Sequence, residues 1–201
     1  MADTEIKVFG KWSAKDIIVQ DDGVRDYITL EPKVVMRSAG RYAHSRFHKS
    51  KVFIVERLVH KLMNSGHKAK KHFKSSGHMT GKVQTAQGIV EKAFRIIEQR
   101  TKKNPVEVFV KGLENAAPRE EIITIEYGGA RYPKAVECAP QRRIDLALRI
   151  MTQGSHHKAF NSKKSIHETL AEEIMNAYNM SPNSSAISKK LELERQADSS
   201  R

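Results

Sequence analysis

The chain has 201 residues, of which 36 are Lys or Arg and 23 are Asp or Glu, so its formal net charge is +13. This length suits one domain with a sizeable core, and no apolar run approaches the roughly 18 residues that a membrane span needs. The chain begins without the apolar stretch of a signal peptide, and its single cysteine, Cys138, excludes an intramolecular disulfide, so we expect a cytoplasmic protein.

Residues 1–50 are weakly patterned and are expected to form an extended, basic N-terminal arm, with a short strand at 27–30. Basic side chains alternate with Tyr42 and Phe47 in residues 37–51, and Gly40 interrupts any helix. A solvated linker is one reading, but aromatic side chains that can stack on bases favour an arm that binds RNA. The candidate RNA contacts in this arm are Arg37, Arg41, Arg46, Lys49 and Lys51.

Three helices are expected next, at about 51–65, at about 82–101 and from Asn104 to a point before Pro118, because apolar residues recur there at helical spacing. Asn104 and Pro105 are typical of the N-cap and first position of the third helix. Between the first two lies a basic stretch, residues 67–82, with five lysines, three histidines and no acidic residue. We interpret it as a phosphate-binding loop rather than a zinc site, which would favour regularly spaced Cys and His. Its candidate contacts are Lys70, Lys71, Lys74 and Lys82.

A β-hairpin is expected at about 120–138, because Gly128 and Gly129 suit the positive φ angles of a two-residue turn. The predicted register pairs Tyr127 with Ala130, Glu126 with Arg131, Ile125 with Tyr132 and Thr124 with Pro133. A lone two-stranded ribbon is marginal in water, so a partner should hold it. Basic residues at the ribbon and its base, Arg119, Arg131, Lys134, Arg142 and Arg143, indicate a polyanionic partner.

Three further helices are expected at about 140–152, 165–178 and 185–197, the last with a frayed end. Arg142 and Arg143 fall in the first turn of the first of these, where cations are unfavourable by about 0.3–1 kcal/mol each. This position favours a phosphate contact over a pair that simply faces solvent. Further candidate contacts are Arg149 in that helix and Lys158, Lys163 and Lys164 in a basic loop that is expected to start at Gly154.

The predicted fold is therefore mainly α: a bundle of about six helices with a protruding β-hairpin between the third and fourth. Residues 1–50 would form the N-terminal extension, and residues 51–201 a helical RNA-binding domain. No convergent active site is found, since the sequence lacks a phosphate-binding loop, a G-x-S-x-G motif and an H-E-x-x-H motif. Cys138 is interpreted as a packed, inert thiol. We expect no catalysis, cofactor, metal, membrane or small-molecule substrate; a histidine-dependent nuclease is the less favoured enzyme alternative.

Several motifs in one order resemble a known family. They are NPVEVF from Asn104, ENAAPREE from Glu114, YGGARY from Tyr127, PQRRIDLALR from Pro140 and LAEE from Leu170. Together they resemble ribosomal protein seven of the small subunit. FGKW from Phe9, SAGR from Ser38 and AISKK from Ala186 are similar to its archaeal and eukaryotic branch. The basic stretch at 67–82 departs from the family in being longer.

The resemblance implies a primary binder of small-subunit ribosomal RNA that nucleates assembly of the head, the 3′ major domain. It also implies a place near the exit site for tRNA and mRNA, with neighbouring head and platform proteins. On the matching positions, the ribbon tip near tRNA and mRNA would be Tyr127, Gly128, Gly129, Ala130, Arg131 and Tyr132, and Arg119, Arg142 and Arg143 would belong to the RNA face at the ribbon's base. The alternative is a non-ribosomal regulator that binds nucleic acid.

Overall fold

The computed structural model describes residues 5–68, 71–72 and 77–201. Its α-helices are α1 (Asp22–Arg25), α2 (Ile54–Leu62), α3 (Val83–Thr101), α4 (Pro105–Ala116), α5 (Pro140–Ala159), α6 (Ile166–Tyr178) and α7 (Ser185–Asp198). Two 3₁₀ turns lie at His48–Lys51 and Gly77–Met79. The strands are β1 (His67–Lys68), β2 (Lys71–His72), β3 (Glu120–Tyr127) and β4 (Ala130–Glu137). The described chain is thus mainly helical, and the predicted fold class is confirmed.

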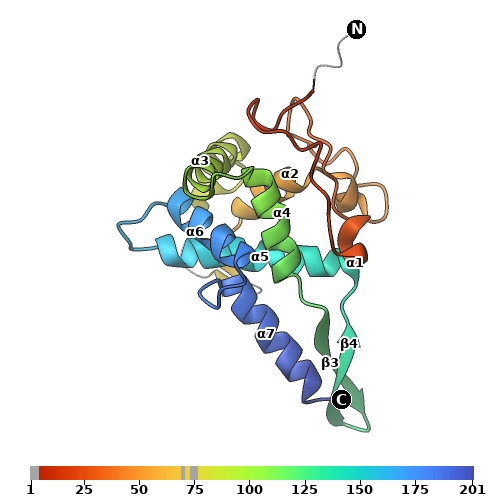
Figure 1. Ribbon diagram of the computed structural model, residues 1–201. Helices are drawn as coiled ribbons and strands as arrows, with labels where there is room; N and C mark the ends of the chain where they lie inside the picture. The colour runs from red at the N-terminus through yellow and green to blue at the C-terminus, as the bar shows by residue number, and fades with distance from the viewer. Residues whose placement is uncertain (1–4, 69–70, 73–76) are drawn as a thin grey trace.

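The helices pack around α5 and α6, and the β3–β4 hairpin projects away from the bundle (Figure 1). Phe53, Phe94 and Phe109 are among the largest fully buried side chains of the single core cluster. The predicted start of α4 is confirmed, because Asn104 accepts a hydrogen bond from the Val106 backbone N–H. The helix expected from residue 165 also begins there, where Ser165 forms a reciprocal capping box with Glu168. These caps satisfy backbone donors that would otherwise lack partners.

The N-terminal segment packs on the bundle rather than extending from it. Val8, Trp12 and Val24 are buried in the same core cluster as the helices. The Trp12 ring meets the Phe94 ring edge-on, with 5.9 Å between centroids. No strand forms at residues 27–30; Thr29 makes only an isolated parallel bridge with Phe53. The expected strand is therefore corrected, because the segment that follows Phe53 turns at once into α2 and offers no ladder to extend.

The hairpin has the predicted register, from Tyr127 opposite Ala130 down to Glu120 opposite Glu137. Gly128 and Gly129 have φ angles of 58° and 82°, the left-handed values that the tight turn requires. The base of β3 is partly buried, and the strand is exposed from Ile123 to its tip. The ribbon is therefore supported at its base and free along its outer half.

The chain itself braces the base of the ribbon. Helix α7 lies beside β3 (Figure 1), and Ala197 near its end is fully buried. The Arg119 backbone N–H donates to Glu194 Oε1 at 3.1 Å, and Arg201 forms an ion pair with Glu120. The expectation of a frayed α7 is therefore wrong in this structure: its last turn is packed and paired against the hairpin.

Helix α5 is longer than the sequence indicated. It continues through Gly154 to Ala159, so the basic loop that was expected from residue 154 begins only at Phe160. Gly154 permits a close approach, since a Cβ atom there would lie 2.6 Å from the Ser185 hydroxyl oxygen. The glycine is thus a packing residue and not a helix breaker.

The expected loop at 67–82 also changes in part, because β1 and β2 pair within it.

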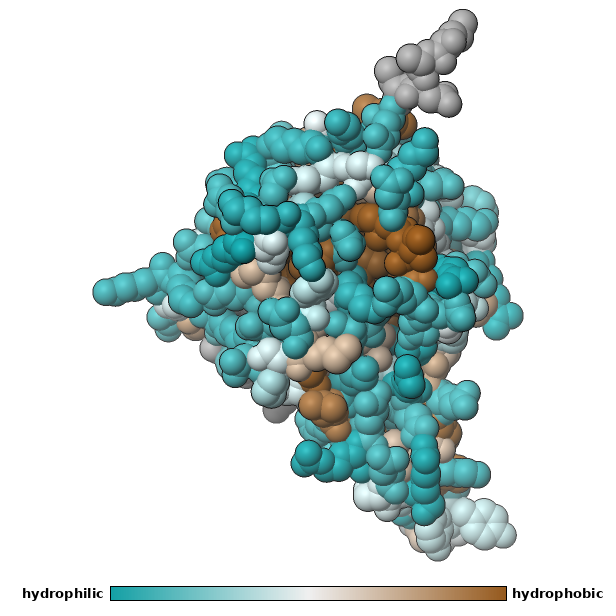
Figure 2. Space-filling model, in the orientation of Figure 1, coloured by the Kyte–Doolittle hydropathy of each residue, from teal (hydrophilic) through white to brown (hydrophobic). Residues whose placement is uncertain are grey.

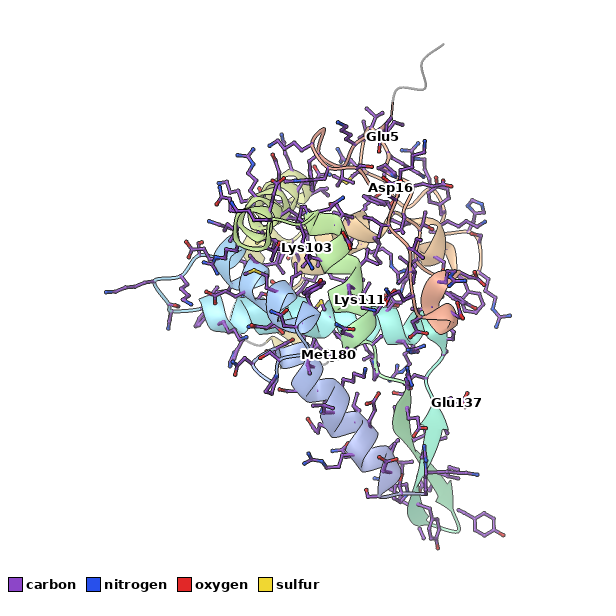
Figure 3. All side chains as sticks on the ribbon, in the orientation of Figure 1. Glu5, Asp16, Lys103, Lys111, Glu137 and Met180 are labelled. Atoms are coloured by element: carbon purple, nitrogen blue, oxygen red, sulfur yellow. The ribbon has the colours of Figure 1, made fainter. Side chains whose placement is uncertain are left out.

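The surface is mainly hydrophilic, with a smaller apolar patch on the face shown in Figure 2. Long charged side chains cover the molecule from the N-terminal segment, where Glu5 and Asp16 lie, to Glu137 at the base of the hairpin (Figure 3). None of the helices in the described part of the chain combines the length and the apolar character needed to cross a membrane.

Candidate nucleic-acid interface

Most of the predicted RNA contacts lie at the surface. The exposed ones are Arg37, Arg41, Arg46, Lys49, Lys51, Lys82, Arg119, Arg142, Arg149, Lys158, Lys163 and Lys164. Arg143 is the buried exception among the predicted cations whose side chains are described. Lys70 and Lys74 lie outside the described residues, and only the backbone of Lys71 is described.

Helix α5 arranges three charged side chains in one stripe. Arg142, Asp145 and Arg149 are spaced three and four residues apart, which places them on one face of the helix. Arg142 lies at the ribbon's base and Arg149 about 10 Å further along the axis, at 1.5 Å per residue. The stripe therefore connects the hairpin base to the middle of the bundle.

The two arginines at the start of α5 have different roles. Arg142 is 54% exposed and pairs with Glu121 through two close contacts, of 2.5 and 2.7 Å. Arg143 is only 9% exposed; it pairs with Asp21 at 2.6 Å and donates from Nε to the Pro118 carbonyl at 3.1 Å. The expectation of a surface phosphate contact at Arg143 is therefore corrected: its guanidinium joins parts of the fold. The hairpin base keeps Arg142 and Arg119 as exposed cations.

Lys158 also has a structural role. Its Nζ donates to Glu173 Oε2 at 2.7 Å and to the Asn183 carbonyl at 2.9 Å, between α6 and α7. Glu173 is fully buried and also accepts from Ser184 Oγ at 2.8 Å. Lys164 in turn pairs with Glu172. In the basic stretch that follows Gly154, these carboxylates compete with any phosphate for Lys158 and Lys164.

The segment at 37–51 leaves its three arginines unpaired, although its Lys49 pairs with Asp145. Arg41 donates only to backbone carbonyls, those of Ser38 and Arg37, at 3.2 and 3.1 Å. The Arg46 guanidinium lies 5.0 Å from the centroid of the exposed Phe47 ring. Within the described residues, Arg37, Arg41 and Arg46 have no carboxylate at ion-pair distance. This stretch therefore presents positive charge and an aromatic face together, as single-stranded RNA requires.

A cavity between the N-terminal segment, α2 and α5 brings together residues from distant parts of the chain. Lys49 pairs with Asp145 at 3.0 Å, and the buried Arg57 pairs with the same carboxylate at 3.3 Å. Burial raises the pKa of Asp145, but its contacts with Lys49 and Arg57 outweigh burial and lower it overall. Lys61 also lines this cavity. Arg57 and Lys61 were not selected as candidate contacts from the sequence. Their i, i+4 spacing, opposite the apolar stripe of α2, nevertheless places both side chains on one polar face of the helix.

The ribbon tip is the most exposed part of the hairpin. The Tyr127 and Tyr132 side chains are 81% and 57% exposed. Arg131 lies 3.8 Å from Glu126, its predicted cross-strand partner. The tip thus offers two aromatic rings and little net charge.

Cys138 is not positioned for catalysis. It follows β4 directly, at the base of the hairpin, and is buried there; burial together with the nearby Glu121 raises the pKa of the thiol to about 11. A thiol with this pKa stays protonated near neutral pH and is a poor nucleophile. The prediction of a packed thiol is confirmed.

Comparison with known proteins identifies the family. A model of the family described as ribosomal protein S7p/S5e matches residues 24–201. The chain belongs to this family. Its members are structural ribosomal proteins and not enzymes. The resemblance found in the sequence is confirmed, and the nuclease alternative loses its support.

Curated relatives extend this likeness over almost the whole chain. A protein of Nanoarchaeum equitans named small ribosomal subunit protein uS7 is 55% identical over 197 residues, which cover 98% of this chain and 100% of the relative. The proteins of the same name from Archaeoglobus fulgidus and Methanothrix thermoacetophila are 46% and 44% identical, each over 98% of this chain and over 96% and 100% of their own lengths. All three relatives are archaeal, in agreement with the predicted branch.

Proposed function

We propose that the protein is a structural component of the small ribosomal subunit in the cytoplasm, where it binds ribosomal RNA directly. Membership of the family and the net charge of +13 support this role. The observation that carries it is the concentration of unpaired, exposed arginines beside Phe47 in residues 37–51. Cations without a carboxylate partner bind phosphate without first breaking an ion pair. They therefore contribute most to the free energy that is gained when counterions leave the RNA phosphates.

The mechanism we infer is electrostatic and shape-based. The helical core fixes the spacing between the segment at 37–51, the α5 stripe and the hairpin base, so that these groups meet phosphates of one folded RNA junction. In this role the protein nucleates folding of the 3′ major domain into the head of the subunit. Neighbouring head and platform proteins would then contact its remaining surface.

We further propose that the ribbon tip lies near the exit site for tRNA and mRNA. The small residues Gly128, Gly129 and Ala130 allow a close approach to another chain, while Tyr127 and Tyr132 present flat rings suited to stacking. The near-neutral tip suits a transient contact, which strong phosphate binding would hinder.

Cosedimentation tests the ribosomal assignment. Cellular protein should remain with small subunits through a moderate-salt wash, and a non-ribosomal regulator would instead form a separate soluble pool. Crosslinking of the purified protein to ribosomal RNA then tests the interface. Crosslinks should arise from residues 37–51 and from the hairpin base around Arg119 and Arg142, and their confinement to other surfaces would contradict the proposed RNA face.

A further inference from the structure

The cavity between the N-terminal segment, α2 and α5 has the size and lining of a ligand site. Its volume is about 640 Å³, within the range of roughly 300–1,000 Å³ that is common for small-molecule sites. Four cations line it, Lys49, Arg57, Lys61 and Arg149, against one carboxylate, that of Asp145. The cavity is therefore positively charged even before the histidines on its wall are counted.

The charges in the cavity do not balance. Asp145 is already shared by Lys49 and Arg57, at 3.0 and 3.3 Å. Lys61 is half-buried and has no carboxylate within ion-pair distance among the described residues. Burial lowers the pKa of Lys61; the charge of Asp145 opposes this, but the charges of Lys49, Arg149 and Arg57 add to the lowering, and the pKa falls overall. A half-buried cation without a direct ion-pair partner is costly, and an anion bound in the cavity would reduce this cost.

Polar neutral groups complete the lining. Asn64 lies in the turn that follows α2, where its backbone N–H donates to the Lys61 carbonyl at 3.2 Å, and Gln153 lies one turn beyond Arg149 on α5. The Gln153 amide nitrogen donates to the His67 carbonyl at 2.8 Å, which fixes the orientation of this side chain. Side-chain amides offer both donors and acceptors, as recognition of a base edge requires.

We propose that this cavity holds a single nucleotide of the bound RNA, turned out of its helix, with its phosphate between Lys61 and Arg149 and its base toward Asn64 and Gln153. This inference rests on the proposed RNA-binding function and names a specific site within it. A nucleotide in a continuous duplex cannot enter a cavity, whereas unpaired nucleotides of loops and bulges are commonly splayed out and bound in this way. Lys supplies a compact charge and Arg a planar fork, the two usual partners of phosphate.

Replacement of one lysine provides the first test. Lys61→Met keeps the apolar stem and removes the charge, and Lys92→Met, on the exposed face of α3, is the matched control. Affinity of the full chain for a transcript of the 3′ major domain should fall at least tenfold for K61M and no more than about twofold for K92M. The thermal midpoint of free K61M should equal or exceed that of the wild type, because a half-buried unpaired charge has been removed.

The outcomes separate this site from the wider function. If K61M binds the transcript as tightly as the wild type, while loss of Arg37, Arg41 and Arg46 weakens binding, the nucleotide site is refuted and the RNA-binding function stands. If the wild type itself fails to bind the transcript, the proposed function is refuted as well. A K61M variant that loses both RNA affinity and thermal stability has lost a structural contact, which also contradicts the proposal.

A second test uses small probes on the wild-type chain. Adenosine and uridine 5′-monophosphate should shift the NMR signals of the Lys61 and Gln153 side chains and raise the pKa of Lys61 toward its ordinary value. Inorganic phosphate should shift Lys61 alone and bind more weakly. Equal binding of all three probes would show a general anion site and overturn the base contact. Unchanged Lys61 signals with every probe would overturn the site.

Discussion

Arg143 and Asp21 form an ion pair of 2.6 Å across 122 residues of sequence, which ties the start of α5 to the N-terminal segment. The same guanidinium donates to the Pro118 carbonyl, at the entrance to the hairpin. Gly23 leaves room for it, since a Cβ atom there would lie 2.8 Å from Arg143 Nη1. One buried side chain therefore joins the N-terminal segment, the α4–β3 connection and α5.

Loss of the Asp21 charge should destabilise the fold. Asp21→Asn keeps the hydrogen bond that caps α1, but it leaves the buried Arg143 without its counterion. Because Asp21 is partly exposed, we expect a loss of about 1–2 kcal/mol in the free energy of unfolding, below the cost of breaking a fully buried pair. Urea denaturation measures it. Asp22→Asn, at a side chain that is 83% exposed, is the control and should change stability by less than about 0.5 kcal/mol.

The stabilisation by Asp21 should depend on pH. Burial raises its pKa, but the hydrogen bond and charge of Arg143 outweigh burial, so the pKa in the folded protein lies below the ordinary value. The unfolded aspartate titrates near pH 3.9, so the contribution is present above about pH 4 and is lost as the pH falls through the lower, folded pKa. The stability difference between wild type and D21N should be full at pH 7 and shrink below pH 4. A stability difference that stays constant across this pH range would contradict the proposed dependence of stability on the ionisation of Asp21.

The neighbouring arginines should respond differently to substitution. Arg143→Ala removes a buried ion pair and hydrogen bond and should cost about 3 kcal/mol of stability. Arg142→Ala removes an exposed partner of Glu121 and should cost about 1 kcal/mol or less, while reducing the salt dependence of RNA binding by about one phosphate contact. Paired unfolding and filter-binding measurements separate the two effects. Equal stabilities of R142A and R143A would contradict the structural role of Arg143 and the exposed position of Arg142.

The segment at 37–51 should dominate the salt dependence of RNA binding. Replacement of Arg37, Arg41 and Arg46 by Ala removes three exposed cations that lack carboxylate partners in the described structure. The slope of log affinity against log salt should fall by about two to three, with unchanged thermal stability. A triple replacement of Lys92, Arg95 and Arg100 on α3 lowers the net charge equally. The same slope change in both variants would show that only total charge matters.

Two helical glycines offer a matched test of packing. Gly88 of α3 has open space where a Cβ atom would lie, so Gly88→Ala should stabilise the protein by about 0.5–1 kcal/mol. At Gly154 the new Cβ would lie 2.6–2.7 Å from the Ser185 side chain. Gly154→Ala should therefore destabilise by about 1–3 kcal/mol despite its better helix propensity. Calorimetry should show shifts of opposite sign in the thermal midpoints of the two variants. A rise in both midpoints would mean that α7 lies further from α5 than in this structure.

Local chemistry explains what the sequence predicted correctly. The hairpin register follows from Gly128 and Gly129, and the starts of α4 and α6 follow from Asn104 and Ser165, because turns and caps depend on adjacent residues. The apolar stripes of α2 and α3 likewise follow from spacing alone. The candidate interface residues were chosen by residue type and charge, which indicate exposure on average but do not reveal which side chains are already paired within the fold.

Long-range contacts explain what the sequence did not predict. The buried Arg143 pairs with Asp21, and Gly154 packs closely against Ser185; neither partner is close in sequence. The packing of the N-terminal segment rests on scattered side chains such as Val8 and Trp12, which have no regular period. The placement of Lys61 and Arg149 in one cavity likewise depends on the packing of α2 against α5.

The bracing of the hairpin by α7 has a consequence for synthesis. A ribosome completes β3 and β4 long before it makes Ala197 and Arg201, the residues that hold the ribbon's base. Until then the nascent ribbon has exposed isoleucines and lacks its supporting helix, a state that is open to strand pairing with other chains. The segment from Ala197 to Arg201 thus completes the support of the ribbon only at the end of synthesis. An early stop codon would release a chain whose unsupported ribbon is prone to aggregation.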